Sequence, residues 1–162
     1  MNGTGELVAA ALSLGAERVA GLSVAERALS PAGNVPAAGL RERIEAGEDP
    51  LGEALAAIRG VNERRRLGQT LTPLPIVGSM VRWAADQAGP AGPCRVIDPG
   101  TGSARFLLAA GRRWPGAELV GVETDPVAAL IARANLAAAG LAVRARVILA
   151  DYRSLRLPAA AG

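Results

Sequence analysis

The 162-residue sequence predicts an α/β fold, in which a partial, doubly wound parallel sheet is preceded by a helical N-terminal segment. Short apolar runs at 95–98, 118–123 and 144–150 alternate with single helical stretches. A glycine-rich turn follows the first run, and an acidic residue stands at the end of each. Strands joined through single helices form parallel sheets with right-handed crossovers. We therefore divide the chain into a helical segment, 1–66, and a sheet-forming domain, 67–162.

The helical segment carries start and stop signals for several helices. Ser23 and Glu26 match a capping box, S-x-x-E, at the start of a short helix. Pro36 suits the first turn of a helix that ends at Gly47. Asp49–Pro50 repeats the start signal, and the apolar face of the helix that follows is predicted to be Leu51, Ala54, Leu55 and Ile58.

The sheet-forming domain begins with a further helix. Thr72 is its predicted N-cap and Pro73 its first-turn proline, and its apolar face comprises Ile76, Met80, Trp83, Ala84 and Gln87. A helix over 103–113 follows the first strand, and Asp125 caps a second one that Gly140 closes. The inner face of this last helix is predicted to be Val127, Leu130, Ile131 and Ala134.

The composition excludes several kinds of site. The chain has no His and a single Cys, Cys94, which excludes Ser–His–Asp and Cys–His sites, zinc ribbons and disulfide frameworks. We expect no metal site, and we expect Cys94 to fill the core in a reducing compartment. We also expect Trp83 and Trp114 to be packing residues. The formal net charge of +3 permits a nucleic-acid partner without arguing for one.

The N-terminus carries no targeting signal that we can identify. It lacks a basic region, and its first apolar run ends near Gly15, which is too short to cross a bilayer. We therefore expect no membrane association and a cytoplasmic location.

Acidic residues and glycines gather where the predicted strands end. Asp98, Glu123 and Asp151 follow the three strands in turn, and Gly100 and Gly102 lie in the first turn. Ligands of such sheets bind outside the carboxyl ends of the strands. In dinucleotide-binding folds, a carboxylate about 20 residues beyond the glycines accepts hydrogen bonds from ribose hydroxyls, and Glu123 has this spacing. The pattern predicts a nucleoside ligand.

The position of Asp98 indicates which nucleoside. A pyrophosphate would bind at the N-terminus of the following helix, and a carboxylate directly before the turn would repel it. S-adenosylmethionine instead presents an ammonium group and a sulfonium, with only one carboxylate. The order of acid before glycine therefore favours S-adenosylmethionine over NAD or FAD.

Four segments resemble class I S-adenosylmethionine-dependent methyltransferases, in the form found in adenine-specific (N6) DNA methyltransferases. VIDPGTGSARFLL, 96–108, resembles their glycine motif, and VGVETDPVA, 120–128, their second motif. LADY, 149–152, resembles the third, and RRRLGQTLTP, 64–73, the upstream G-Q-x-x-T-P segment. The resemblance covers over half of the chain and implies a Rossmann-like methyltransferase domain.

The resemblance implies a role in cofactor binding for each matched residue. Glu123 would hold the ribose, Asp151 would bond the adenine amino group of the cofactor, and Tyr152 would pack on that ring. Asp98 would bind the ammonium group of the methionine moiety. The residues implied to surround the methionine end are Gln69, Thr72, Pro73, Asp98, Gly100 and Gly102.

The glycine motif departs from the family pattern at two positions. Thr101 replaces the usual Cys, and Ala104 replaces a Gly. Both residues are small, so we expect cofactor binding to persist, although an alanine at 104 disfavours a positive φ.

Simpler interpretations of the acidic residues also stand. Asp98 could cap the turn, Glu123 could be a solvated charge at a strand end, and Asp151 with Tyr152 could be ordinary turn chemistry. The run Arg64–Arg66 could contact phosphates or be a solvated helix end.

The D/N-P-P-Y/F motif, which in this family receives a flipped adenine, occurs nowhere in the sequence. We therefore expect the cofactor-binding part of a longer DNA methyltransferase, of a restriction–modification or phage-defence kind, truncated before the fourth strand. We expect it to be inactive alone and assign it no catalytic residue. DNA would be bound through the part that is missing.

Two alternatives remain at this point. The first is a different enzyme with a similar turn, either an RNA or small-molecule methyltransferase or a nicotinamide-dependent oxidoreductase. The second is a non-catalytic remnant. With the family's strand order, 3-2-1-4, the first strand would be an unpaired apolar edge. Such an edge invites pairing with a second chain and predicts marginal stability.

Overall fold

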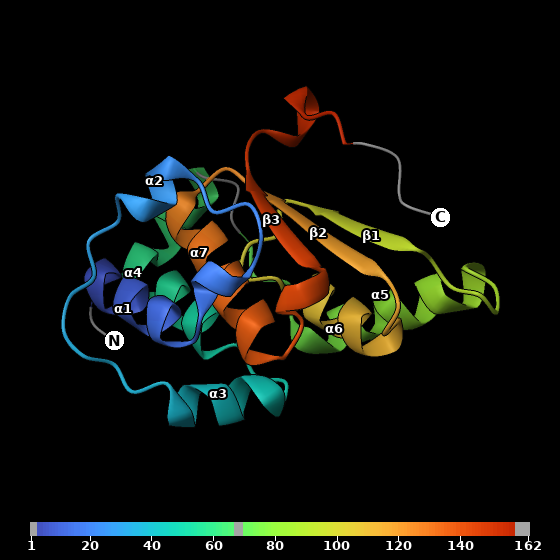
Figure 1. Ribbon diagram of the computed structural model, residues 1–162, viewed down its shortest axis with the longest axis horizontal. Helices are drawn as coiled ribbons and strands as arrows, with labels where there is room; N and C mark the ends of the chain where they lie inside the picture. Colours follow the sequence, from blue (N-terminus) through green and yellow to red (C-terminus); the bar gives the residue numbers. More distant parts are fainter. Residues whose placement is uncertain (1–2, 67–69, 158–162) are drawn as a thin grey trace.

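The computed structural model describes residues 3–66 and 70–157, and it shows a three-stranded parallel sheet with helices packed against it (Figure 1). In these ranges, no helix combines the length and the apolar character needed to cross a bilayer. The elements that precede the sheet are α1 (Thr4–Ser13), η1 (Ala16–Arg18), α2 (Val24–Arg27), α3 (Ala38–Glu45), α4 (Pro50–Arg66) and α5 (Leu74–Gln87).

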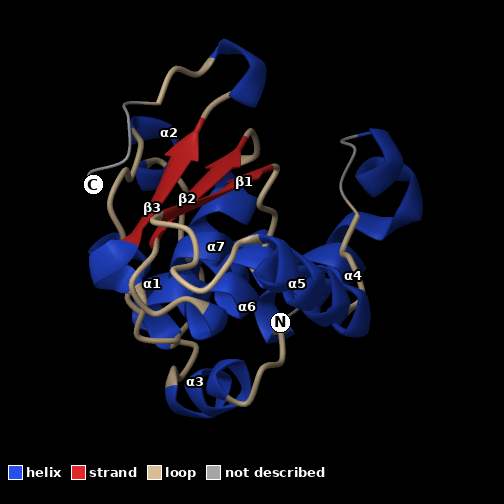
Figure 2. Cartoon of the chain, turned by 90° about the vertical axis from the view of Figure 1, so that its right-hand side faces the viewer, coloured by secondary structure: helices blue, strands red, loops and turns tan. Residues whose placement is uncertain are grey.

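The strands lie in the order β1-β2-β3, and both pairs are parallel. A helix joins each pair, and Figure 2 shows α5, α6 and α7 on one side of the sheet. The predicted α/β fold class is therefore confirmed, and each predicted strand lies within one residue of the observed one. The elements are β1 (Arg95–Pro99), α6 (Arg105–Arg113), β2 (Glu118–Glu123), α7 (Pro126–Ala138), η2 (Ala142–Arg144), β3 (Ala145–Leu149) and η3 (Tyr152–Ser154).

Helix α7 is buried on almost all sides, whereas the sequence predicted one inner face. Its residues Ala129, Ala132 and Leu136 pack in the cluster that also contains β2 and β3 residues. Leu130 and Ile131 pack in a second cluster with residues of α1, α3 and α4. The N-terminal helices thus cover the side of α7 that faces away from the sheet, and the two clusters share this helix.

A buried ion pair joins the N-terminal segment to α7 and β3. Arg133 and Glu26 have fully buried side chains, with 2.6 Å between Nε and Oε1. The Arg133 guanidinium also donates to the carbonyl oxygens of Val19, Ala20 and Val147, at 3.0, 2.7 and 2.6 Å. The Val147 N–H donates to the Ala20 carbonyl at 3.1 Å, so residues 19–21 lie along the outer edge of β3.

Several helix starts differ from the prediction, although the capping box of Ser23 with Glu26 is confirmed. Helix α3 begins at Ala38, so Pro36 precedes the helix instead of lying in its first turn. In α5 the N-cap is Pro73 and not Thr72. The cause is a second proline, Pro75, which takes the early helical position that suits a residue without an N–H.

Two expectations about packing are wrong. Cys94 is exposed, because it precedes a strand at the edge of the sheet. Trp83 is 67% exposed, and Ile76 and Met80 on the same face of α5 are also exposed. Trp114 does pack against the sheet cluster, as predicted.

Strand β1 lies at an open edge of the sheet. Among the described residues it pairs with β2 alone, and its apolar Ile97 is 39% exposed. The unpaired edge predicted from the sequence is thus present in the described part of the chain.

Candidate functional site

The glycine turn folds over the carboxyl end of β2. The N–H groups of Gly100 and Thr101 both donate to the Val122 carbonyl, at 2.8 and 2.9 Å. Gly100 and Gly102 have φ angles of 97° and 54°, which favour glycine. A Cβ at either position would meet nothing within 4 Å. The outer side of the turn is therefore open, and a ligand can approach the backbone there.

The turn ends in a strained residue, Ala104. This residue is fully buried and takes φ 72° and ψ 26°, the left-handed conformation that the sequence predicted an alanine to disfavour. Its N–H donates to the Thr101 carbonyl at 2.8 Å. Helix α6 consequently begins at Arg105 and not at the predicted Ser103.

We expect Ala104→Gly to leave the free energy of unfolding within about 0.8 kcal/mol of the wild-type value. Glycine removes the left-handed cost of about 1–2 kcal/mol, but it gives up a buried methyl group worth about 0.8 kcal/mol and adds backbone entropy to the unfolded chain worth about 0.4–1 kcal/mol. The control is Ala110→Gly, at a buried position inside α6, where we expect a loss of about 2 kcal/mol. Urea denaturation measures both, and equal losses would contradict the strain.

Glu123 anchors the turn to the end of β2. Its carboxylate accepts the backbone N–H groups of Gly102, Thr124 and Asp125, at 2.9, 2.8 and 3.1 Å. Only 7% of the residue is exposed. The interpretation of Glu123 as a solvated charge is therefore wrong. The Thr124 hydroxyl also donates to Oε1, at 3.4 Å, so Oε1 has three donors while Oε2 has the Gly102 N–H alone among the described residues. Oε2 therefore keeps capacity for a further donor.

Asp98 lies near the end of β1, just before the turn. It accepts a hydrogen bond from the Thr101 hydroxyl at 3.1 Å, as a capping residue would. Burial raises the pKa of Asp98; the Thr101 hydrogen bond opposes this rise, and the negative charge of Glu123 adds to it. The charged form of Asp98 is thus poorly compensated, and a cation beside it would stabilise that form.

Asp151 follows β3 and makes the contacts of a local turn. It accepts the Arg153 N–H at 2.9 Å and pairs with the Arg153 guanidinium at 2.6 Å. The hydrogen bond from the Arg153 side chain, helped by the one from the Arg153 N–H, lowers the pKa of Asp151 to about 2. Tyr152 is about half exposed beside it. These contacts match the turn chemistry that the sequence left open, and a ligand role for both residues stays a prediction.

A backbone group of the upstream segment, in its described part, contacts the site. The carbonyl oxygen of Thr72, directly before Pro73, accepts a hydrogen bond from Nη1 of Arg105 at 2.8 Å. Gln69 lies outside the described residues, as do the side chains of Arg64–Arg66.

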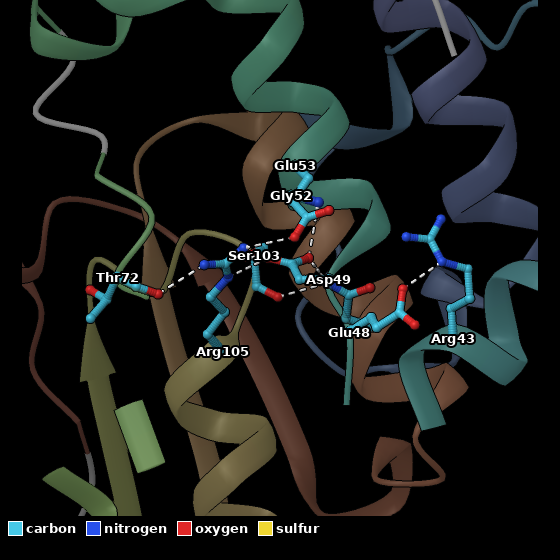
Figure 3. Close-up of polar contacts among 9 residues, drawn as sticks. Arg43, Glu48, Asp49, Gly52, Glu53, Thr72, Ser103 and Arg105 are labelled. Carbon is cyan, nitrogen blue, oxygen red and sulfur yellow. Dashed lines mark hydrogen bonds and ion pairs between the residues drawn. The ribbon is translucent and has the colours of Figure 1, made fainter. Parts of the chain in front are cut away.

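A buried carboxylate, Asp49, connects the glycine turn with three helices (Figure 3). Its Oδ1 accepts the Gly52 N–H at 2.9 Å and the Asn135 side-chain amide at 3.1 Å. Its Oδ2 accepts the Ser103 hydroxyl at 2.5 Å and Nε of Arg105 at 2.7 Å. The helix start predicted at Asp49–Pro50 is confirmed, and the Gly52 contact makes Asp49 the N-cap of α4; the other three contacts were not predicted.

The sequence held one signal for this cluster. Residues 127–138 are apolar except for Arg133 and Asn135, and a helix that is apolar on all sides is typically buried. Buried polar side chains need partners, so both residues indicated polar groups on the elements packed around α7. The tertiary structure was needed to identify those partners, which are Glu26 for Arg133 and Asp49 for Asn135.

Comparisons with known proteins confirm the resemblance to methyltransferases. The chain is 48% identical over 125 residues to the Type II methyltransferase M.XamI of Xanthomonas campestris pv. amaranthicola, which covers 77% of this chain and 21% of that protein. It is 38% identical over 69 residues to a tRNA1(Val) (adenine(37)-N6)-methyltransferase of Porphyromonas gingivalis, covering 43% of this chain and 27% of that protein. No family model matches.

Among solved structures, the chain is similar to a modification subunit of a putative type I restriction enzyme from Vibrio vulnificus YJ016. The TM-score is 0.47 and the identity 21%, over 68% of this chain and 24% of that one. The chain spans about a fifth of the length of the Type II relative and about a quarter of each of the other two proteins.

Proposed function

We propose that this chain is the S-adenosylmethionine-binding part of a DNA methyltransferase that transfers a methyl group to adenine N6, of a restriction–modification or phage-defence kind. The observation that carries the proposal is the half-buried Asp98, poorly compensated beside an open glycine turn. It occurs within a chain that shares 48% identity over 125 residues with a Type II methyltransferase.

The described residues suit S-adenosylmethionine better than a dinucleotide. Asp98 would bind the ammonium group, which supplies the positive charge that this carboxylate lacks. Glu123 would accept ribose hydroxyls with its remaining capacity, while it holds the turn in place. Thr72 and Pro73 would lie toward the methionine end, with Asp151 and Tyr152 toward the adenine. The cofactor supplies an electrophilic methyl group on its sulfonium.

Methyl transfer and DNA recognition would need residues beyond these. The sequence contains no D/N-P-P-Y/F motif, so we propose that the chain alone binds cofactor without transferring the methyl group. We propose that DNA is bound by sequence that corresponds to the rest of the Type II relative. The open edge of β1 is where a further strand, from the same enzyme or from a second chain, would pair.

RNA methylation is the second candidate function. The similarity to a tRNA1(Val) (adenine(37)-N6)-methyltransferase over 69 residues favours it. The longer and closer match to the Type II methyltransferase favours DNA. Transfer of a labelled methyl group to tRNA and not to DNA, by an enzyme that carries this segment, would decide for the second candidate.

Calorimetric titration of the purified chain tests which cofactor it binds. We expect saturable binding of S-adenosylmethionine and none of NAD, because Asp98 attracts a cation and repels a pyrophosphate. Urea denaturation of the same sample establishes that the chain is folded. If the folded chain binds NAD equally well, or binds neither ligand, the proposed function is wrong.

A further inference from the structure

Arg105 ties the upstream segment to the start of α6. Its Nε lies 2.7 Å from Oδ2 of Asp49, and its Nη1 donates to the Thr72 carbonyl at 2.8 Å. The side chain is only 10% exposed, and Glu53 lies 3.8 Å from its Nη2 at the edge of the cluster. Figure 3 shows the guanidinium between Thr72 on one side and Asp49 with Glu53 on the other. One side chain thus links two segments that are far apart in the sequence.

The same Asp49 oxygen also holds the glycine turn. Ser103 directly follows Gly102, and its hydroxyl donates to Oδ2 of Asp49 at 2.5 Å. Asn135 of α7 supports the contact from behind, because its amide donates to Oδ1 of Asp49 at 3.1 Å and to the Ser103 carbonyl at 2.9 Å. Asp49, Ser103 and Asn135 are all buried, so these contacts are shielded from water.

We infer that Asp49 and Arg105 are positioning residues that hold the glycine turn and the Thr72–Pro73 segment in register around the methionine end of the cofactor. The inference rests on the proposed function. It assigns the N-terminal helical segment, which supplies Asp49, a part in cofactor selectivity in addition to its part in the fold. Neither residue touches the cofactor in this assignment; both act through Thr72 and Ser103.

Arg105→Lys tests the link. A lysine has one ammonium group on a flexible stem, so it can pair with Asp49 but cannot reproduce two hydrogen bonds from separate nitrogens. The Thr72 carbonyl then loses its charged donor. We expect the affinity for S-adenosylmethionine to fall by about tenfold, the scale of one lost hydrogen bond to a charged group.

A truncated ligand distinguishes a specific effect on the methionine end from a general distortion of the site. 5′-Methylthioadenosine keeps the nucleoside and the sulfur but lacks the amino-acid part of methionine. If Arg105 positions the methionine end, the affinity of the Lys variant for this ligand should change less than about twofold. If the role of Arg105 is merely structural, the affinities for both ligands should fall by the same factor.

Arg112→Lys is the matched control. Arg112 also lies on α6 and also donates to backbone carbonyls of the N-terminal segment, those of Ile44 and Glu45, at 3.1 and 3.2 Å. It lies near the opposite end of the helix from the glycine turn. We expect its Lys variant to lose stability in urea as Arg105→Lys does, and to keep the affinities for both ligands.

The outcomes of the titrations are distinct. Selective loss of S-adenosylmethionine affinity in Arg105→Lys alone supports the inference. Equal loss of both ligands, unchanged affinities in a folded Arg105→Lys, or the same selective loss in Arg112→Lys overturns it. A folded wild-type chain that binds neither ligand would instead refute the proposed function, and the inference with it.

Discussion

Replacing Glu26 by Gln is expected to lower the free energy of unfolding by about 3 kcal/mol, because it leaves the fully buried Arg133 guanidinium without a counter-charge. The ion pair joins the N-terminal segment to α7, and the same guanidinium reaches carbonyls of the segment 19–20 and of β3. The loss should therefore affect the whole domain and appear as one cooperative urea transition at lower denaturant.

The matched control for this variant is Glu48→Gln. Glu48 pairs with Arg43 at the same Nε to carboxylate distance of 2.6 Å, but the two side chains are 51% and 49% exposed. Exposed ion pairs contribute about 0–1 kcal/mol. If the two variants lose similar free energies of unfolding, burial is not the reason why the Glu26–Arg133 pair stabilises the fold.

Replacing Asp98 by Asn is expected to change stability and cofactor affinity in opposite directions. Burial raises the pKa of Asp98 in the folded chain, so its favourable contribution is present below the unfolded pKa and is lost as the pH rises through the folded pKa. At pH 7 the charged group destabilises the fold, and Asn should raise the free energy of unfolding. This gain should vanish near pH 3, where the carboxyl is protonated in both states.

The same substitution should lower the affinity for S-adenosylmethionine by at least about tenfold, because the ammonium group loses its charged acceptor. In the wild-type chain, affinity should rise with pH as Asp98 loses its proton. Urea denaturation at pH 7 and pH 3, with calorimetric titration at pH 7, measures these effects. A destabilised Asp98→Asn chain at pH 7 would contradict the argument.

Glu123→Gln provides the comparison within the same site. Glu123 already accepts three backbone N–H groups, so its charged form is well compensated without a ligand. We expect Gln at this position to lower stability at pH 7 by about 1–3 kcal/mol. The two carboxylates therefore differ in the sign of their effect on the fold, although both face the same turn.

The strands and the glycine turn could be predicted because their signals are local. The strands were predicted from short apolar runs that alternate with helical stretches, and an acidic residue, Asp98, Glu123 or Asp151, marks the end of each run. The N-caps at Asp49 and Asp125 follow from the Asp-Pro pairs, and both are observed. Each of these features involves residues only a few positions apart.

The rest of the site joins residues that are distant in the sequence. Asp49 lies 56 positions before Arg105 and 86 before Asn135, so neither pattern nor spacing connects them. The burial of α7 on both sides was missed for the same reason, because the helices that cover it come from the first 66 residues. Ala104 was misjudged differently: the turn imposes a positive φ that local preference disfavours.

The two edges of the sheet are unlike, since residues 19–21 follow the outer edge of β3 while β1 is open in the described part of the chain. A sheet with two free edges can extend indefinitely into fibres by repeated addition of copies. A sheet with one blocked edge supports only a self-limiting union, in which two open edges meet and no further edge is left. The contact at Ala20 therefore directs edge-to-edge pairing toward β1 and away from β3.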